Sequence, residues 1–348
     1  MSGPALGALD SLGMLAASAG LPEQVRAAAE LSAGLDGLPA AENVENVVVL
    51  GMGGSGIAGD VVLGVAGPFL AVPLTVVKSY TAPAFVGPAT LVVAVSFSGD
   101  TEETVEAAGE ALAAQAALVV VAGGGRLAEL ARRAEVPFVG VPTSIPVPRA
   151  AIGAMSVPLL MILEGVGLFH GVRRWVDLAV AQLERRREQL LGQSSPAAEV
   201  ARRIGRTIPL IHSSTGLGAA AALRWKAQVN ENAKSPAFCS LYPELCHNEV
   251  AGWGQMGDVT RQLVTLVNLR HDFEHPQVAR RFQLVRDILD EVVADTCEVR
   301  AEGEGELAQL LDLVMFGDFV SLHLAAQEGV DPGPLPVLEE IKGSLRLG

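Results

Sequence analysis

Short aliphatic runs, each followed by a polar or glycine-rich turn and then by a helical pattern, constrain the fold of this chain more than any other feature. Residues 44–50 form the first run, which leads into the glycine-rich segment 51–56 and an apolar helix beginning at Ile57. Strands of a parallel sheet are buried on both faces and therefore read as continuous aliphatic runs. Further strands are expected at 74–77, 91–95, 117–121 and 137–141, with helices at 101–115 and 127–134. This alternation predicts a parallel α/β sheet.

A second series of the same kind begins near residue 208, where a strand (208–212) runs into the turn Ser213-Ser214-Thr215-Gly216. The segment 191–196 (LGQSSP) reads as a turn between the two halves. Later strands are expected at 263–269 and 296–299, and helices at 22–35, 150–168, 175–191, 217–229, 277–293, 306–327 and 335–347. The sequence therefore predicts two domains, residues 1–190 with a leading helix and residues 191–348 with a terminal helix. Each is expected to be a parallel sheet covered by helices on both faces.

Composition and charge exclude several classes of function. A formal net charge of −14 argues against a nucleic-acid surface, which needs clustered Lys and Arg. The uncharged stretches 61–77 and 79–99 are interrupted by prolines, so neither is expected to span a membrane. No basic residue precedes Arg26, so we expect no secretory signal and a cytoplasmic protein.

The three cysteines are expected to be reduced thiols. The spacing of Cys239 and Cys246 does not match a zinc-binding pair, and no second pair follows. We interpret them, with Cys297, as small buried apolar residues and expect no metal.

The first glycine-rich turn is compatible with two kinds of ligand. Gly51, Gly53 and Gly56 match the G-x-G-x-x-G pattern of dinucleotide sites. That pattern also requires an acidic residue at the end of the second strand, where this chain has Lys78-Ser79-Tyr80. A nicotinamide dehydrogenase is therefore disfavoured, and no cofactor is expected. The glycines could also serve only to form a tight turn.

The second turn favours a phosphate ligand. The run 91–95 ends in Ser96-Phe97-Ser98-Gly99-Asp100-Thr101, directly before a helix. One of these residues could be a simple helix N-cap. Several hydroxyl groups around a glycine at a helix N-terminus also provide the donors that bind a phosphate monoester. Asp100 is compatible with such a site if it points outward as a cap.

Glu231 and His247 are the candidates for proton transfer. Glu231 lies between two asparagines at the end of a predicted helix, and His247 begins the polar triplet His247-Asn248-Glu249. A carboxylate and an imidazole among amides and apolar residues suit proton transfer at a carbon centre. Either residue could instead be an ordinary surface group, and His212, at a strand end, is the alternative histidine.

These segments together resemble the bifunctional phosphoglucose/phosphomannose isomerases, a branch of the SIS (sugar isomerase) domain proteins. The resemblance covers roughly residues 40–345. It rests on five motifs in order, which are Met52-Gly53-Gly54-Ser55-Gly56, the turn 96–101, Pro148-Arg149-Ala150-Ala151, Asn230-Glu231-Asn232-Ala233-Lys234 with 244–253, and Gly329-Val330-Asp331-Pro332. It implies two SIS-type, flavodoxin-like subdomains, a homodimer with the active site near its interface, and a sugar-phosphate substrate.

Roles follow from the resemblance at matching positions only. The phosphate would be held by Gly53, Gly54, Ser55, Ser96, Ser98 and Thr101. Arg149 would stabilise the enediolate, and Glu231 would move a proton between C2 and C1. His247 would assist ring opening, reaching across the dimer interface. A buried Arg149 also requires a partner, and we favour a ligand oxyanion over a protein carboxylate.

The resemblance implies interconversion of glucose 6-phosphate, and of mannose 6-phosphate, with fructose 6-phosphate through a cis-enediol. Relatives carry a threonine and a lysine near the Val-Asp-Pro segment, where this chain has Gly333-Pro334-Leu335-Pro336 and, further on, Lys342. The alternative hypothesis is therefore a phosphosugar-binding protein without catalysis, or a degraded isomerase.

Overall fold

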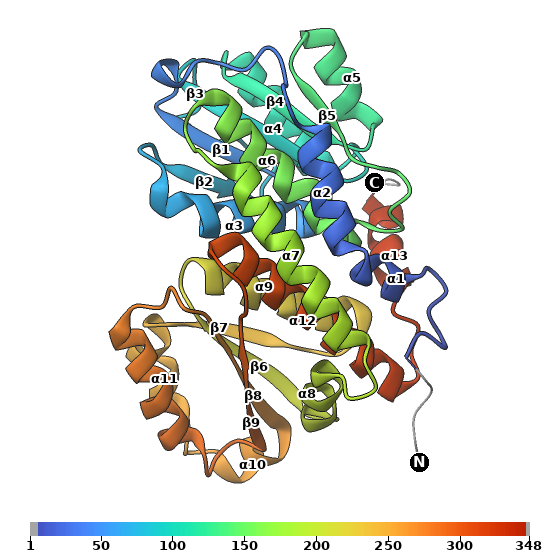
Figure 1. The fold of residues 1–348 in the computed structure, drawn as a ribbon, viewed down its shortest axis with the longest axis vertical. Coiled ribbons are helices and arrows are strands. Elements are labelled where there is room, and N and C mark those ends of the chain that lie inside the picture. Colours follow the sequence, from blue (N-terminus) through green and yellow to red (C-terminus); the bar gives the residue numbers. More distant parts are fainter. Residues whose placement is uncertain (1–5, 346–348) are drawn as a thin grey trace.

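Two parallel sheets, one in each half of the chain, form the framework of the protein (Figure 1). The computed structural model describes residues 6–345. The first sheet has the strand order β2-β1-β3-β4-β5 and the second has the order β7-β6-β8-β9. The strands are β1 (Asn46–Leu50), β2 (Leu74–Val77), β3 (Thr90–Ser96), β4 (Ala117–Ala122), β5 (Phe138–Gly140), β6 (Ile208–Ser214), β7 (Phe238–Tyr242), β8 (Val264–Arg270) and β9 (Asp295–Arg300).

Helices lie on both faces of each sheet. Those of the first half are α1 (Met14–Ala19), α2 (Leu21–Leu31), α3 (Gly53–Ala66), α4 (Glu102–Ala113), α5 (Gly125–Ala134), α6 (Ile152–Val166) and α7 (Val172–Leu191). Those of the second half are α8 (Pro196–Ile204), α9 (Leu217–Asn232), α10 (Gly257–Leu263), α11 (Pro276–Leu289), α12 (Glu306–Glu328) and α13 (Pro336–Leu345). Short 3-10 turns include η3 (Pro148–Ala150), η4 (Glu244–His247) and η5 (Glu249–Gly252).

The alternation of side chains along each strand explains this layering. In β3, Val93 and Val95 join the core beneath α3 and α6, whereas Val92 and Ala94 face α4 and α5. All seven residues of β3 are buried, as expected of a central strand with helices on both sides. The predicted α/β class, with two parallel sheets covered on both faces, is confirmed.

One long helix joins the two halves. The chain segment α12 packs against α7, α8 and α9, and its apolar side chains belong to the same core cluster as those of β3. By length and composition α12 could cross a membrane, but 94% of its most apolar window is buried inside the protein. It is therefore a core helix of the kind that fills the space between two sheets.

The predicted elements match the structure closely where the aliphatic pattern is strong. The strand expected at 74–77 is β2 with the same bounds, and the helix expected at 306–327 is α12. Among the α-helices and strands of residues 6–345, α1, α8, β7 and α10 were not predicted. The helix expected at 277–293 ends earlier, at Leu289.

The cysteines differ from one another. All three are free thiols, and only Cys297 is buried, whereas Cys239 and Cys246 are half-buried, so the prediction of burial is wrong for these two. Burial raises the pKa of the Cys297 thiol to about 11. Among residues 6–345, no group of three or more His, Cys, Asp or Glu side chains is placed to hold a metal ion.

Candidate active site

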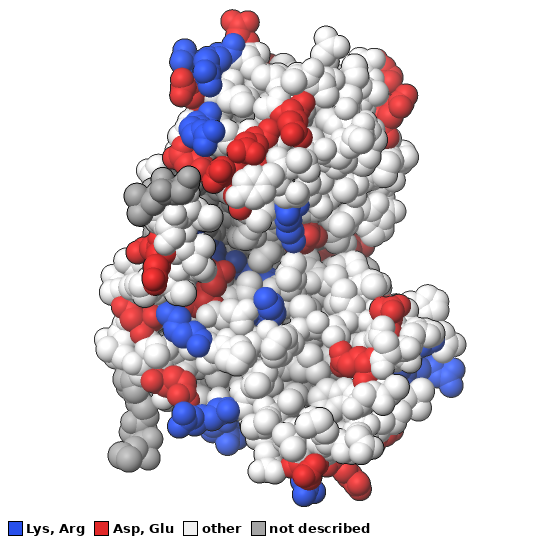
Figure 2. Space-filling view, turned by 180° about the vertical axis from the view of Figure 1, so that it is seen from behind, with Lys and Arg blue, Asp and Glu red and all other residues white. Residues whose placement is uncertain are grey.

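A cavity of about 440 Å³ lies where the carboxyl ends of the first sheet's strands meet the end of α9. Its lining comes from both halves of the chain: Leu12, Met52, Gly53, Gly54, Ser55, Phe97, Ser98, Thr101, Glu103, Val147, Pro148, Arg149, Glu231, Gly333, Pro334, Leu335, Leu338, Glu339 and Lys342. This volume is typical of small-molecule sites, and open α/β sheets bind ligands at this edge. Figure 2 shows the molecule hollowed between its two halves, with both basic and acidic atoms inside the hollow.

The two predicted phosphate turns lie side by side. The first follows β1 and forms the start of α3, and the second follows β3 and leads into α4. The Ser55 hydroxyl accepts a hydrogen bond from the backbone N–H of Phe97, at 3.1 Å, and so joins the two turns. Both turns present a helix N-terminus to one cavity, where free N–H groups and the helix dipole favour an anion.

The predicted phosphate-binding residues differ in their placement. Gly53, Gly54, Ser55, Ser98 and Thr101 line the cavity. Ser96 is fully buried beneath the turn, where its hydroxyl lies 2.9 Å from Thr101 Oγ1 and accepts a bond from Gly99 N–H. Ser96 therefore orders the turn from below and does not line the cavity.

Asp100 points away from the cavity. Its carboxylate accepts a hydrogen bond of 2.9 Å from the backbone N–H of Arg126, near the start of α5. The sequence raised the possibility that Asp100 points outward as a cap of the helix after the turn; in the structure it bonds the start of α5, and the N-cap of α4 is Thr101. A negative charge at this position stabilises α5 through the helix dipole without occupying the phosphate-binding side of the turn.

Replacing Gly99 with alanine should disrupt the second turn. Gly99 has a φ of +79°, and an added Cβ would lie 1.8 Å from the carbonyl oxygen of Gly124. We expect Gly99→Ala to lower the free energy of unfolding by on the order of 3 kcal/mol, because backbone strain and a backbone clash combine. Urea denaturation measures this change. Gly87→Ala is the control, since open space surrounds Gly87. A Gly99→Ala protein as stable as Gly87→Ala would contradict the expectation.

Glu231 lies in the last turn of α9 and faces the cavity from the second half of the chain. Its side chain is 29% exposed. The neighbouring asparagines donate elsewhere, Asn230 to the carbonyl of Ser235 and Asn232 to the hydroxyl of Ser321. Glu231 thus has no hydrogen bond from either amide, and its carboxylate remains available to a ligand in the cavity.

Arg149 is buried at the bottom of this cavity. Its side chain is 4% exposed, and its Nη1 lies 3.6 Å from the Glu231 carboxylate. Nε donates to Asn232 Oδ1 at 2.8 Å, and Nη2 donates to the carbonyl oxygens of Pro332 and Gly333. Burial lowers the pKa of the Arg149 guanidinium, and the Glu231 carboxylate opposes this shift.

The partners of Arg149 refine the expectation from the sequence, which favoured a ligand oxyanion over a protein carboxylate. The Glu231 carboxylate lies 3.6 Å from Nη1, and uncharged protein groups accept the hydrogen bonds of Nε and Nη2. Only Nη1, which is directed toward Glu231, remains to contact a ligand. Because Nε and Nη2 are fixed by the protein, Nη1 has a defined position before any ligand binds.

Neither candidate histidine lines the cavity. His247 is exposed at the end of η4, in a segment anchored by buried Leu245. His212 is fully buried in β6, where Nε2 lies 2.7 Å from the Glu249 carboxylate. The imidazole of His212 therefore holds the segment that carries His247, and within one chain His247 does not meet Glu231 at the cavity.

Several cavity residues were not recognised from the sequence. Residues of α13 contribute Leu338, Glu339 and Lys342. Lys342 was noted in the sequence as the nearest lysine to this segment. No sequence pattern indicated that its helix would face the cavity. Lys342 therefore places a cation at the cavity, whereas the segment Gly333–Leu335 contains no charged residue.

The corresponding turn of the second sheet, which follows β6, has its serine hydroxyl groups hydrogen-bonded within the protein. Ser214 Oγ lies 2.6 Å from His271 Nε2, and the Ser213 hydroxyl donates to the carbonyl of Leu269. Burial lowers the pKa of His271. The two halves thus share a strand–turn–helix plan, but in the second half the hydroxyl groups of Ser213 and Ser214 are bonded within the protein.

The sequence of this chain is similar to those of known isomerases. A family model of the bacterial phospho-glucose isomerase C-terminal SIS domain matches residues 193–345. The bifunctional phosphoglucose/phosphomannose isomerase of Caldicellulosiruptor bescii is 32% identical over 93% of this chain and 96% of its own length. The enzyme of the same name from Aquifex aeolicus is 34% identical over 87% of this chain and 91% of its own length.

The fold is also shared with solved structures of low sequence identity. The C-terminal domain of glucosamine-fructose-6-phosphate aminotransferase from Francisella tularensis superimposes with a TM-score of 0.70 at 14% identity, covering 93% of this chain and 98% of that domain. This likeness concerns the fold alone. The full-length similarity to the curated enzymes decides the family: the chain belongs to the bifunctional phosphoglucose/phosphomannose isomerases.

Proposed function

We propose that this protein is an aldose–ketose isomerase that interconverts fructose 6-phosphate with glucose 6-phosphate and mannose 6-phosphate in the cytoplasm. The names of its relatives state this activity for those proteins. The observation that carries the proposal is the single cavity in which two hydroxyl-bearing turns lie opposite Glu231 and Arg149. No cofactor is needed for this reaction.

The phosphate is held at the two turns. Backbone N–H groups at the starts of α3 and α4, with the hydroxyls of Ser55, Ser98 and Thr101, supply the donors. The overall charge of the protein is negative, so the phosphate depends on these local donors. Anchoring one end of the open-chain sugar places its first two carbons toward Glu231.

Glu231 then moves the proton. Its carboxylate takes the C2 proton of the aldose, and the C1 carbonyl oxygen becomes an enediolate oxygen. The proton of the C2 hydroxyl then passes to this C1 oxygen, the C2 oxygen becomes the new carbonyl oxygen, and Glu231 returns its proton to C1 to give the ketose. Arg149 Nη1 stabilises the developing oxyanion from a fixed position, which is the arrangement that lowers such barriers most. Because an enediol is planar, return of a proton to either face of C2 yields glucose or mannose 6-phosphate.

The proposal is tested with fructose 6-phosphate in deuterium oxide. We expect formation of both glucose and mannose 6-phosphates, detected with coupled enzymes, and deuterium at C2 of these products by NMR. Binding of fructose 6-phosphate without turnover would instead support the non-catalytic phosphosugar protein.

His247 completes the site in a homodimer, according to this proposal. It is exposed and outside the cavity of its own chain, as a residue contributed to a partner copy must be. From there it assists opening of the sugar ring before proton transfer.

Mixing two inactive variants tests this arrangement. Glu231→Gln and His247→Ala chains are each expected to form weakly active homodimers. A mixed dimer contains one site with both residues intact, so co-refolding the two variants should restore up to about a quarter of wild-type activity if the chains pair at random. The coupled assay measures it. Activity no greater than the mean of the two variants would exclude a contribution from the partner.

A further inference from the structure

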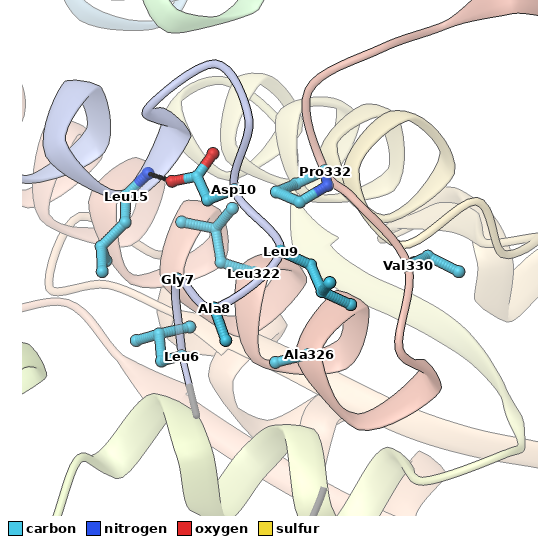
Figure 3. A pocket seen from close by; sticks show the side chains of 10 residues that line it. All are labelled: Leu6, Gly7, Ala8, Leu9, Asp10, Leu15, Leu322, Ala326, Val330 and Pro332. Carbon is cyan, nitrogen blue, oxygen red and sulfur yellow. Dashed lines mark hydrogen bonds between the residues drawn. The ribbon is translucent and has the colours of Figure 1, made fainter. Parts of the chain in front are cut away.

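Residues 331–335, which connect α12 to α13, form one wall of the candidate active site. Gly333, Pro334 and Leu335 line the cavity, and α13 continues the same wall. No residue of α13 is buried, so its position depends on this connection. On the opposite side, Figure 3 shows Pro332 beside the N-terminal segment that carries Leu9 and Asp10, and Val330 lines the same pocket.

Two cationic side chains bind the backbone of this connection. Arg149 Nη2 donates to the carbonyl oxygens of Pro332, at 2.6 Å, and Gly333, at 2.5 Å. Lys234 Nζ donates to Pro332 O at 3.3 Å and to the carbonyl oxygen of Glu231 at 2.5 Å. Lys234 therefore links the end of the helix that bears Glu231 to the wall opposite it. We call these two cations and the carbonyls of Pro332 and Gly333 the clasp.

The backbone of Lys234 adopts a conformation that favours glycine, which Gln115 and Glu135 also adopt among the described residues. Lys234 has a φ of +56° and follows the C-cap of α9. Glycine is the usual residue at such a left-handed position, as at Gly167 after α6 and Gly329 after α12. A residue with a Cβ costs about 1 kcal/mol there. Unlike glycine, lysine has an ammonium group, which donates here to the carbonyl oxygens of Glu231 and Pro332.

A helix cap alone does not account for these contacts. Lysine near a helix C-terminus often bonds the last free carbonyls, and the contact with Glu231 O fits that role. The contact with Pro332 O joins residues 98 positions apart in the chain and adds nothing to α9 itself. Its effect falls on the connection 331–335 and hence on the cavity wall.

We infer that Lys234 is a positioning residue, which together with Arg149 fastens residues 331–335 and thereby fixes the α13 wall relative to Glu231. The kinetic part of this inference rests on the proposed isomerase function. The mechanical part does not, because it concerns only how the wall is held.

Hydrogen exchange of the amides in residues 333–345, followed by mass spectrometry in the absence of substrate, tests the clasp. We expect Lys234→Met to exchange about tenfold faster there, since a charge-assisted hydrogen bond is lost. Lys234→Gly relieves the backbone strain, yet its amides in residues 333–345 should exchange as fast as those of Lys234→Met. If Lys234 served only as a helix cap, the glycine variant should instead exchange like wild type. Lys226→Met is the matched control and should exchange like wild type, because Lys226 lies within α9 and makes no hydrogen bond to residues 331–335 among the described contacts.

Kinetics with fructose 6-phosphate provide the second measurement. Loosening the wall should raise KM about tenfold in Lys234→Met while kcat stays within about twofold, and Lys234→Arg should recover most of the loss. If wild-type protein shows no turnover, the proposed function fails while the exchange measurement still decides the clasp. Exchange rates in Lys234→Met and Lys234→Gly equal to those of wild type would overturn the inference.

Discussion

Replacing Glu231 with glutamine should reduce kcat about 10³-fold while leaving the affinity for fructose 6-phosphate within a few-fold of wild type. A positioned general base contributes about 10²–10⁴-fold to the rate of proton transfer, and an amide cannot accept the proton. The phosphate donors lie on other elements, at the starts of α3 and α4, so binding should survive. Initial rates from the coupled assay and calorimetric titration measure the two quantities separately.

Glu103 offers a matched control, because it is a second carboxylate that lines the same cavity, at the start of α4. Glu103→Gln removes one negative charge from the cavity without touching the proposed base. We expect kcat to remain within about threefold of wild type. A Glu231→Gln enzyme as active as Glu103→Gln would remove Glu231 from the role of base.

Replacing Arg149 with methionine should damage both stability and catalysis. The guanidinium satisfies Asn232 Oδ1 and the carbonyls of Pro332 and Gly333, which would be left with unmet hydrogen bonds in a buried place. Removing one partner from such a buried network costs about 3–5 kcal/mol. We also expect kcat to fall about 10²-fold, because the donor to the enediolate oxygen is lost.

Urea denaturation and the coupled assay, run at a temperature where the variant remains folded, separate these effects. Arg149→Lys should recover only part of the loss, because an ammonium group cannot replace a planar guanidinium with donors in three directions. Arg126→Met, at an exposed position near the same end of the first sheet, serves as the control. A single hydrogen bond contributes about 1 kcal/mol net to the free energy of unfolding. If the free energies of unfolding of Arg149→Met and of that control differ by less than about 1 kcal/mol, this account is contradicted.

The sequence predicted the strongly patterned parts of this protein. Aliphatic runs such as 91–95 located the strands, and the polar residues after them located the two turns that line the cavity. The strand β7 was missed because its sequence, FCSLY, is not a continuous aliphatic run. It lies at the edge of the second sheet, and Tyr242 is the one buried residue of this strand. Helix α8 was missed because it is short and begins with Pro196, which also reads as part of a turn.

The parts that could not be predicted depend on contacts between distant segments. Arg149 was expected to be buried and paired, but its carbonyl partners lie 183 and 184 residues further along the chain. No local pattern identifies them. The pairing of His212 with Glu249, 37 residues apart, and the position of Lys342 at the cavity also depend on segments that are distant in the sequence.

The central position of α12 determines whether the two halves of the chain can fold separately. Its side chains and those of both sheets form one continuous apolar cluster, in which Trp225 of α9 donates a hydrogen bond to the backbone of α12 at Leu313. A fragment containing only the segment matched by the SIS family model would expose the surface of α12 that α7 covers in the intact chain. The two similar halves should therefore melt in a single cooperative transition, and the chain is best engineered as one unit.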